Sequence, residues 1–339
     1  MFQPKYTITG PLLANIRRIA ETVARLNERR FPHVVLFEME RAAREISAHA
    51  STSIEGNPLP LTDVKRLLKQ APERARDSER EVLNYNAALL ALNDRAKASS
   101  ADLQTILETH RLVTDGLLPE FSSGIIRSAP VFVNDPQAGE TVFWPPDHAD
   151  VPTLLADLVA FVASGRGTVD PLILAGIFHK QFVLIHPFID GNGRTVRLMT
   201  THLLASLGID TFRLFSFERY YNANVTKYFT TVGERGNYYD LNVDFTAWLE
   251  YFTDGVLDEL VRVSDALEKS AVSPSGLGAH HRAVLEYLRD HPFINDAVYA
   301  TLTDRAKSTR AADFRFLLDQ KLIERRGKGK ATQYVLCSV

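Results

Sequence analysis

This sequence of 339 residues has a single cysteine and no long apolar run. That cysteine, Cys337, excludes a disulfide within the chain and any metal site built from cysteines. No window of about 18 uncharged apolar residues occurs, so no membrane-spanning helix is expected. The first residues also lack the basic and apolar segments of a secretory signal. We therefore expect a protein of the reducing cytoplasm that has no membrane partner.

The composition is that of an ordinary globular protein, and a chain of this length is expected to form two or three domains. Its net charge of −2 implies no general attraction to nucleic acids. The charge is unevenly distributed, because residues 281–339 carry a net charge of +4 and residues 1–280 a net charge of −6. A basic tail on an acidic body suggests that the tail has a partner of its own.

Apolar residues recur at helical spacing along most of the chain, which predicts a mainly α-helical fold. The segment 171–185 is almost wholly apolar and begins with a proline, so we expect a buried central helix there. The predicted helices before the tail are 12–27, 34–53, 79–96, 101–117, 151–163, 171–185, 194–207, 222–232 and 245–264.

Residues 129–146 interrupt the helical pattern. Two short β-prone runs, 131–133 and 141–144, flank a turn rich in Asn, Asp, Pro and Gly, and this arrangement predicts a β-hairpin. A two-stranded hairpin alone is only marginally stable in water. The hairpin must therefore pack against the helices or be completed by another strand.

The tail has the element order of a winged helix-turn-helix domain. Three predicted helices, 282–289, 294–302 and 308–319, precede two short strands, 322–326 and 333–336, and Ser308 is the expected N-cap of the third helix. Basic side chains of this domain can contact DNA phosphates, and docking of a protein is the alternative. These side chains are Arg305, Lys307, Arg310, Arg315, Arg325, Arg326, Lys328 and Lys330.

One short segment, HPFIDGNGRTVR from His186 to Arg197, combines the groups that phosphoryl or nucleotidyl transfer requires. Its Gly-Asn-Gly run, placed at the start of a predicted helix, can direct backbone N–H groups at a phosphate. Arg194 and Arg197 share one helix face and add positive charge. Asp190 offers a hard oxygen ligand for Mg²⁺, and a neutral His186 can take a proton from a hydroxyl. A tight turn without chemistry is the alternative for the glycines alone.

The complete segment resembles the signature of the Fic family. His186, Phe188, Asp190, the run 191–194 and Arg197 occupy all eight fixed positions of that signature. The resemblance implies an all-helical core that binds ATP and transfers AMP to a Tyr, Ser or Thr hydroxyl of a protein, with pyrophosphate leaving. Such an enzyme is a protein adenylyltransferase, a kind of nucleotidyltransferase.

By position in the signature, the resemblance implies that His186 is the base that deprotonates the target hydroxyl. Asp190 would hold Mg²⁺, and Phe188 would anchor the loop in the core. The remaining positions would bind the phosphates of ATP, with the second arginine on the γ-phosphate. These phosphate-binding residues are Gly191, Asn192, Gly193, Arg194 and Arg197.

Two further regions resemble Fic proteins more loosely. The run Gly124-Ile-Ile-Arg127, followed by the predicted hairpin, is similar to the flap that holds the target as an added strand. Its expected docking residues are Val131, Phe132 and Val133. After the signature, the expected lining of the adenosine pocket is Tyr220, Tyr221 or Asn224, for which core packing is the alternative.

A second motif, at the end of the predicted helix 34–53, resembles the inhibitory motif of Fic proteins. Ser51, Glu55 and Gly56 fit its pattern of Ser or Thr, three residues, Glu, and then Gly or Asn. If Glu55 reaches Arg197, it takes the charge partner that the γ-phosphate needs, and ATP can bind only in an unproductive pose. The alternative is a surface glutamate at a helix end.

The sequence thus predicts four parts: an N-terminal helical region with the inhibitory motif (1–100), a Fic core (101–269), a linker (270–280) and a winged-helix domain (281–339). The predicted function is an autoinhibited protein adenylyltransferase that uses ATP and Mg²⁺ and also modifies itself. One alternative is AMP removal, or another nucleotidyl or phosphoryl transfer, in the same loop. Another is an ATP-sensing transcriptional regulator. The resemblance further implies a homodimer.

Overall fold

The computed structural model describes residues 2–29, 31, 33–95, 101–134, 139–209, 213–272, 277–320, 322–327 and 329–337. The chain forms two compact units. The first unit comprises Met1–Glu28 and Ala42–Val263, and the second comprises Arg29–Arg41 and Ser264–Val339. None of the described helices combines the length and the apolar character that crossing a membrane requires.

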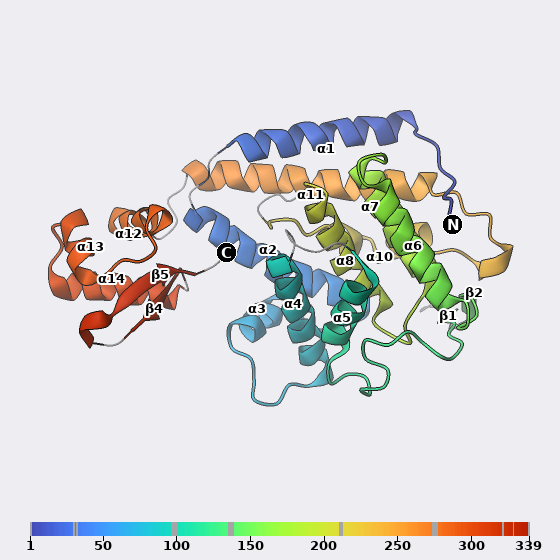
Figure 1. The fold of residues 1–339 in the computed structure, drawn as a ribbon, viewed down its shortest axis with the longest axis horizontal. Coiled ribbons are helices and arrows are strands. Elements are labelled where there is room, and N and C mark those ends of the chain that lie inside the picture. The colour runs from blue at the N-terminus through green and yellow to red at the C-terminus, as the bar shows by residue number, and fades with distance from the viewer. Residues whose placement is uncertain are drawn as a thin grey trace. The chain divides into compact units, whose positions relative to one another are not determined.

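The first unit is built mainly from helices (Figure 1). The predicted helices are found within a few residues of their expected bounds, with two exceptions. The helix predicted at 245–264 continues to Val272, and the range 222–232 contains a break at Asn224, which leaves the helical conformation and caps the next helix. The nine-residue α3 was not predicted. The helices, of which α2 and α11 each have one end in the second unit, are α1 (Gly10–Glu28), α2 (His33–Ile54), α3 (Leu61–Lys69), α4 (Asp77–Arg95), α5 (Leu103–Thr114), α6 (Val151–Gly165), α7 (Pro171–Ile185), α8 (Asn192–Ser206), α9 (Glu218–Ala223), α10 (Val225–Val232) and α11 (Thr246–Val272).

Helix α7 is the central helix of the first unit, as its apolar sequence predicts. Almost all of its side chains are buried, and it packs against α6 and α8. The Asp170 carboxylate accepts hydrogen bonds from the first backbone N–H groups of α7 and so caps its N-terminus. The indole N–H of Trp248 on α11 donates to the carbonyl of Gly176, 2.7 Å away. These contacts fix the position at which α7 ends and the signature loop begins.

Helix α1 runs beside α11 (Figure 1). The Asn15 amide donates to the Asp254 carboxylate at 2.8 Å and to the Thr253 hydroxyl at 3.2 Å. Leu12 joins a buried apolar cluster with residues of α7 and α11. The N-terminal helix is therefore part of the packed core.

The predicted hairpin is present, and a third strand completes it. Strand β1 (Val133–Asn134) pairs antiparallel with β2 (Thr141–Trp144), and β3 (Gly236–Asn237) pairs parallel with β2. A short 3₁₀ helix, Tyr238–Asp240, follows β3. The predicted first strand was wrong in its bounds, because Val131 and Phe132 precede the strand. The turn residues 135–138 lie outside the described residues.

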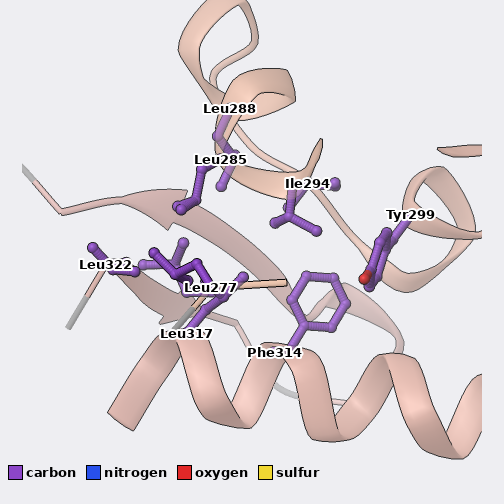
Figure 2. Close-up of a cluster of buried hydrophobic side chains, with 10 residues drawn as sticks. Leu277, Leu285, Leu288, Ile294, Tyr299, Phe314, Leu317 and Leu322 are labelled. Atoms are coloured by element: carbon purple, nitrogen blue, oxygen red, sulfur yellow. The ribbon is translucent and has the colours of Figure 1, made fainter. Parts of the chain in front are cut away.

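The second unit contains the helices and strands expected of the tail in the expected order. They are α12 (Ala279–Asp290), α13 (Asp296–Leu302), α14 (Lys307–Asp319), β4 (Ile323–Arg326), a 3₁₀ turn (Gly329–Ala331) and β5 (Gln333–Leu336). Strands β4 and β5 are antiparallel, and Ile294 forms an isolated bridge with Tyr334. Figure 2 shows Phe314 and Leu317 of α14 facing Ile294 and Leu285 in one apolar core.

Two expectations for the tail differ from the structure. Ser308 is not the N-cap of α14, because the helix begins at Lys307, after Ala306, and no side chain caps it. The segment 270–280, predicted as a linker, is helical at both ends, because α11 extends to Val272 and α12 begins at Ala279. Residues 273–276 of that segment lie outside the described residues.

Candidate functional site

The signature loop connects two buried helices through a sharp turn. Helix α7 ends at Ile185, and His186 caps it with a left-handed backbone (φ 49°) that non-glycine residues seldom adopt. Gly191 is also left-handed (φ 78°) and precedes the first residue of α8. A Cβ atom at Gly191 would lie 2.9 Å from the Thr114 methyl group, so glycine is required there. Such conformations concentrate at functional sites.

The Asn192 side chain fastens the loop to itself. Its Oδ1 accepts a hydrogen bond from the Phe188 backbone N–H at 2.9 Å, and its Nδ2 donates to the Phe188 carbonyl at 2.8 Å. Phe188 is fully buried, so these backbone groups have no access to water. The amide of Asn192 therefore sets the shape of the loop, a role that its place in a phosphate-binding run did not indicate.

His110 of α5 holds the loop in place through hydrogen bonds and stacking, a role that the sequence did not predict. Its Nδ1 accepts from the Gly124 N–H and its Nε2–H donates to the Asp190 carbonyl, each at 2.9 Å. The imidazole stacks on the Phe188 ring at 3.7 Å between centroids. Burial lowers the pKa of His110 to about 4, so the ring stays neutral and can both accept and donate. The sequence around His110 indicated only a helix.

Arg127 connects the segment before the hairpin to the signature loop. Its guanidinium is buried and donates to four backbone carbonyls, at 2.6 to 3.4 Å. Its own backbone N–H donates to the Pro187 carbonyl at 2.9 Å. The hairpin and the loop thus share one buried cation. The four carbonyls belong to Ala129, Pro146, Ile185 and His186.

His186 has the protonation state of a base. Its Nδ1 lies 3.3 Å from the Val183 carbonyl, which can only accept, so Nδ1 carries the proton of the neutral ring. Burial lowers the pKa of His186 to about 4. The Nε2 atom is then unprotonated at neutral pH, and it makes no hydrogen bond with the described residues. The half-buried ring lines the wall of a pocket that opens beside the loop.

Glu55 reaches Arg197, as the inhibitory motif predicts. The Arg197 guanidinium is fully buried and donates to the Glu55 carboxylate at 2.6 Å. It also donates to the hydroxyl of Ser51 at 2.8 Å and to the Ser51 carbonyl at 2.9 Å. Burial acts to lower the pKa of Arg197, but the Glu55 carboxylate, together with the nearby Tyr228 and Tyr85, raises the pKa above its ordinary value.

The Glu55 carboxylate lies over the N-terminus of α8. A Cβ atom at Gly193 would come within 2.1 Å of Glu55 Oε1, so only glycine permits this approach. The first N–H groups of a helix and its dipole favour an anion at this position. The carboxylate therefore occupies the place that the sequence assigns to a phosphate group.

The other two charged residues of the signature point elsewhere. Arg194 is buried, donates to Asp190 Oδ2 at 3.1 Å and lies 3.5 Å from the Glu81 carboxylate. The Asp190 side chain is 61% exposed, and its Oδ1 accepts no hydrogen bond from the described residues. Asp190 and Arg194 are therefore neighbours, while Arg197 faces the pocket on a different side of the loop.

A pocket of about 930 Å³ opens beside these residues. The hairpin, the end of α2, the start of α8 and helix α10 contribute to its walls. This volume is sufficient for a nucleotide-sized ligand. Its lining includes Glu55, His186, Asn192, Gly193, Arg197, Val133, Phe143, Val225, Tyr228, Phe229, Glu234 and Arg235.

The residues expected at an adenosine pocket do not line this cavity. Tyr221 is fully buried and stacks on Tyr228 at 4.6 Å between centroids, which is the core packing considered as its alternative. Tyr220 packs against Tyr251, and the Asn224 side chain accepts from the backbone of α10. The aromatic lining comes instead from Tyr228 and Phe229 of α10 and from Phe143 of β2. Of the three expected docking residues, Val133 lines the pocket, and Val131 and Phe132 do not.

Comparison with known proteins confirms the family resemblance. Residues 100–204 match the Fic/DOC family. The chain is similar to the protein adenylyltransferase fic-1 of Caenorhabditis elegans, with 31% identity over 212 residues, which cover 59% of this chain and 40% of that protein. It is also similar to the protein adenylyltransferase Fic of Drosophila melanogaster, with 29% identity over 216 residues, which cover 58% and 42%. The chain thus matches well under half of the length of these relatives.

Solved structures share the fold. A Fic family protein from Desulfovibrio desulfuricans superposes with a TM-score of 0.67 at 22% identity, covering 100% of this chain and 99% of that one. A fragment of Fic-1 from C. elegans superposes with a TM-score of 0.59 at 24% identity, covering 76% and 73%. The mainly helical architecture is therefore that of Fic proteins.

Replacing Asn192 with alanine should loosen the signature loop. The Asn192→Ala change leaves the buried N–H and C=O of Phe188 unpaired, which should destabilise the first unit by about 2–4 kcal/mol. Both tryptophans, Trp144 and Trp248, lie in the first unit, so urea unfolding followed by tryptophan fluorescence measures its stability. The exposed amide of Gln104 provides a matched control, since Gln104→Ala should change stability by less than about 0.5 kcal/mol. Equal stabilities of the two variants would contradict the role of Asn192.

Proposed function

We propose that this protein, whose residues 100–204 match the Fic/DOC family, transfers the AMP part of ATP to a hydroxyl side chain of a protein and that Glu55 inhibits the transfer. One observation carries the proposal. A neutral histidine and a helix N-terminus, whose anion position is filled by the carboxylate of Glu55, lie in one pocket. Both curated relatives described above are protein adenylyltransferases, which supports the same activity.

His186 is the base in this proposal. Its unprotonated Nε2 accepts the proton of the target hydroxyl while the hydroxyl oxygen attacks the α-phosphorus of ATP. The bond between the α-phosphorus and the bridging oxygen breaks, and pyrophosphate leaves with the electron pair. The left-handed backbone of His186, fixed by Arg127 at its carbonyl, holds the imidazole at the pocket.

The N-terminus of α8 binds the phosphates. Backbone N–H groups around Gly193 and the guanidinium of Arg197 attract negative charge, which the Glu55 carboxylate supplies in this structure. Arg197 binds the γ-phosphate, and Arg194 contacts the β- and γ-phosphates after leaving Asp190. The adenosine end of the nucleotide packs against Val225 and the aromatic side chains of α10.

Asp190 fits a Mg²⁺ ligand. Its exposed carboxylate has one oxygen without a protein hydrogen bond, and Mg²⁺ takes one or two carboxylates together with phosphates and water. When bound, the ion supplies positive charge that neutralises the phosphate oxygens. The protein positions this carboxylate through the hydrogen bond from His110 to the Asp190 carbonyl.

Glu55 competes with the γ-phosphate for Arg197. While the carboxylate accepts the 2.6 Å hydrogen bond, a triphosphate cannot pair with the same guanidinium. Ser51 accepts two further bonds from Arg197 and keeps the guanidinium in place whichever anion is present. Inhibition is thus a competition between two anions for one fixed cation.

A homodimer stays a prediction from the family resemblance.

Releasing this contact should activate transfer. The Glu55→Gly variant should transfer AMP at least about tenfold faster than the parent, because Arg197 becomes available to the γ-phosphate. Glu55→Gln should give an intermediate rate, since the amide keeps the shape of the side chain but loses its charge. The measurement is incorporation of label from [α-³²P]ATP with Mg²⁺ into the protein itself and into a cell lysate, with labelled sites located by mass spectrometry.

Two controls accompany this assay. Glu28→Gly changes another exposed glutamate at a helix end and should leave the rate unchanged. His186→Ala in the Glu55→Gly background should abolish transfer. An unchanged rate in Glu55→Gly would contradict the inhibitory role of Glu55. Transfer that survives His186→Ala would contradict the role of His186 as the base.

The pH dependence of transfer should reflect the lowered pKa of His186. A base with a pKa of about 4 is already deprotonated at pH 5.5, whereas an ordinary histidine is mostly protonated there. We expect kcat/KM of the Glu55→Gly variant to stay nearly constant from about pH 8 to about pH 5.5 and to fall only as the pH approaches 4. Initial rates of AMP transfer across this range test it. A fall centred near pH 6.5 would contradict the assignment.

We also propose that the tail is a winged-helix domain that contacts DNA. Arg305 and Arg310 are not available for this contact, because each forms two hydrogen bonds to a carboxylate, of Asp313 and Asp296 respectively. Exposed cations remain on α14 and β4. They are Lys307, Arg315, Arg325 and Arg326. Lys328 and the side chain of Lys330 lie outside the described residues.

Binding of the full chain to a 30-base-pair duplex, followed by fluorescence anisotropy, tests this contact. The Arg315→Ala/Arg326→Ala variant should bind about tenfold more weakly than the parent at 50 mM salt and should depend less steeply on salt. Lys65→Ala/Lys69→Ala removes two exposed lysines of the first unit and should bind as the parent does. Equal affinities of the two variants would remove the DNA contact and favour a protein partner.

A further inference from the structure

Two half-exposed isoleucines lie next to the signature loop. Ile189 belongs to the loop itself, between His186 and Asp190, and Ile125 belongs to the segment that leads into the hairpin. Each is 50% exposed, and neither lines the nucleotide-sized pocket. A packed core or a nucleotide site therefore does not account for either side chain.

Hydrogen bonds place the two segments that carry these isoleucines next to each other. The Arg127 N–H donates to the Pro187 carbonyl. Three residues away, the ring of His110 joins the Gly124 N–H to the Asp190 carbonyl. Residue 127 is thus next to residue 187, and residue 124 is next to residue 190 across the His110 ring. The two segments therefore run in opposite directions. Residue 125 is therefore aligned with residue 189, so both isoleucines belong to the same small region beside the loop.

The backbone that carries this isoleucine pair is firmly held. Arg127, His110 and Asn192 fix the two segments through buried hydrogen bonds. The exposure of the pair is consequently a property of the folded loop and not of a loosely packed one. Apolar side chains gathered on a rigid surface beside a reactive group mark a contact site for another molecule.

We propose that the isoleucine pair, Ile125 and Ile189, contacts the target protein and selects targets with an apolar side chain close to the modified hydroxyl. The proposal rests on the adenylyltransferase function proposed above. The target hydroxyl must reach Nε2 of His186, three residues before Ile189 in the same loop. Because an extended chain advances about 3.3 Å per residue, target residues two to four positions from the hydroxyl can lie over the pair.

The occupant follows from the position of the pair. ATP binds in the pocket, whose lining excludes both isoleucines. The molecule that must approach His186 from outside the pocket is the acceptor of AMP, which is a protein. An apolar side chain of that protein would cover the isoleucines, whereas a polar one would leave them half exposed to water.

Matched peptides test this selection. Each peptide carries one hydroxyl residue, and separate sets contain Tyr, Ser or Thr. Within a set, the positions two to four residues on either side are leucine in one peptide and glutamine in the other. With the Glu55→Gly protein, the leucine peptide should be modified with a kcat/KM about tenfold higher than the glutamine peptide, mainly through a lower KM.

Replacing the pair should remove this preference. In Glu55→Gly carrying Ile125→Gln and Ile189→Gln, the two peptides should differ by less than about twofold, while KM for ATP stays within about twofold of its former value. Ile8→Gln alters an isoleucine that is 57% exposed elsewhere in the first unit and should keep the preference. Tryptophan fluorescence melts verify that all three proteins are folded.

Each outcome has a definite meaning. Equal use of the two peptides by the Glu55→Gly protein, or a preference that survives both replacements, would overturn the role of the isoleucine pair. Self-labelling without modification of any peptide would reject the pair while leaving the adenylyltransferase function intact. Absence of both self-labelling and peptide labelling would instead reject the adenylyltransferase function, and the pair with it.

Discussion

A fully buried guanidinium, that of Arg197, governs the candidate site. A cation with no access to water requires a nearby anion, because the cost of removing it from water must be offset by a close charge and by hydrogen bonds. Ser51 supplies two of those bonds and Glu55 supplies the charge. The position over the N-terminus of α8 thus favours an anion, and in this structure the carboxylate of Glu55 occupies it.

The same loop presents a neutral base next to this anion site. His186 stays neutral because burial lowers its pKa, and this effect outweighs the hydrogen bond from Nδ1–H to the Val183 carbonyl, which acts to raise it. The geometry of the loop depends on two neutral side chains, His110 and Asn192, which form hydrogen bonds with its backbone groups. Arg127 adds a connection to the hairpin. Rigid support of this kind keeps reacting groups in place while substrates enter and leave.

Much of the fold could be predicted from the sequence, since apolar periodicity located every predicted helix and the purely apolar run located the central one, α7. Turn chemistry located the hairpin, but its partner strand at Gly236–Asn237 could not be foreseen, because a two-residue strand has no periodicity to detect. Ser308 shows the same limit. A residue with good capping chemistry does not cap when the helix begins one position earlier, at Lys307.

By itself, the sequence determined the chemistry of the loop, because the spacing of a base, an acid, a glycine-rich turn and two arginines is a local property of twelve residues. It also indicated that Glu55 lies at the end of a helix, and Glu55 directly follows α2. Only the tertiary structure decided that Glu55 meets Arg197, that Tyr221 belongs to the core, and that the segment of Ile125 lies beside that of Ile189. Each of these is a contact between segments far apart in the chain, and such contacts depend on how the helices pack, which local pattern does not encode.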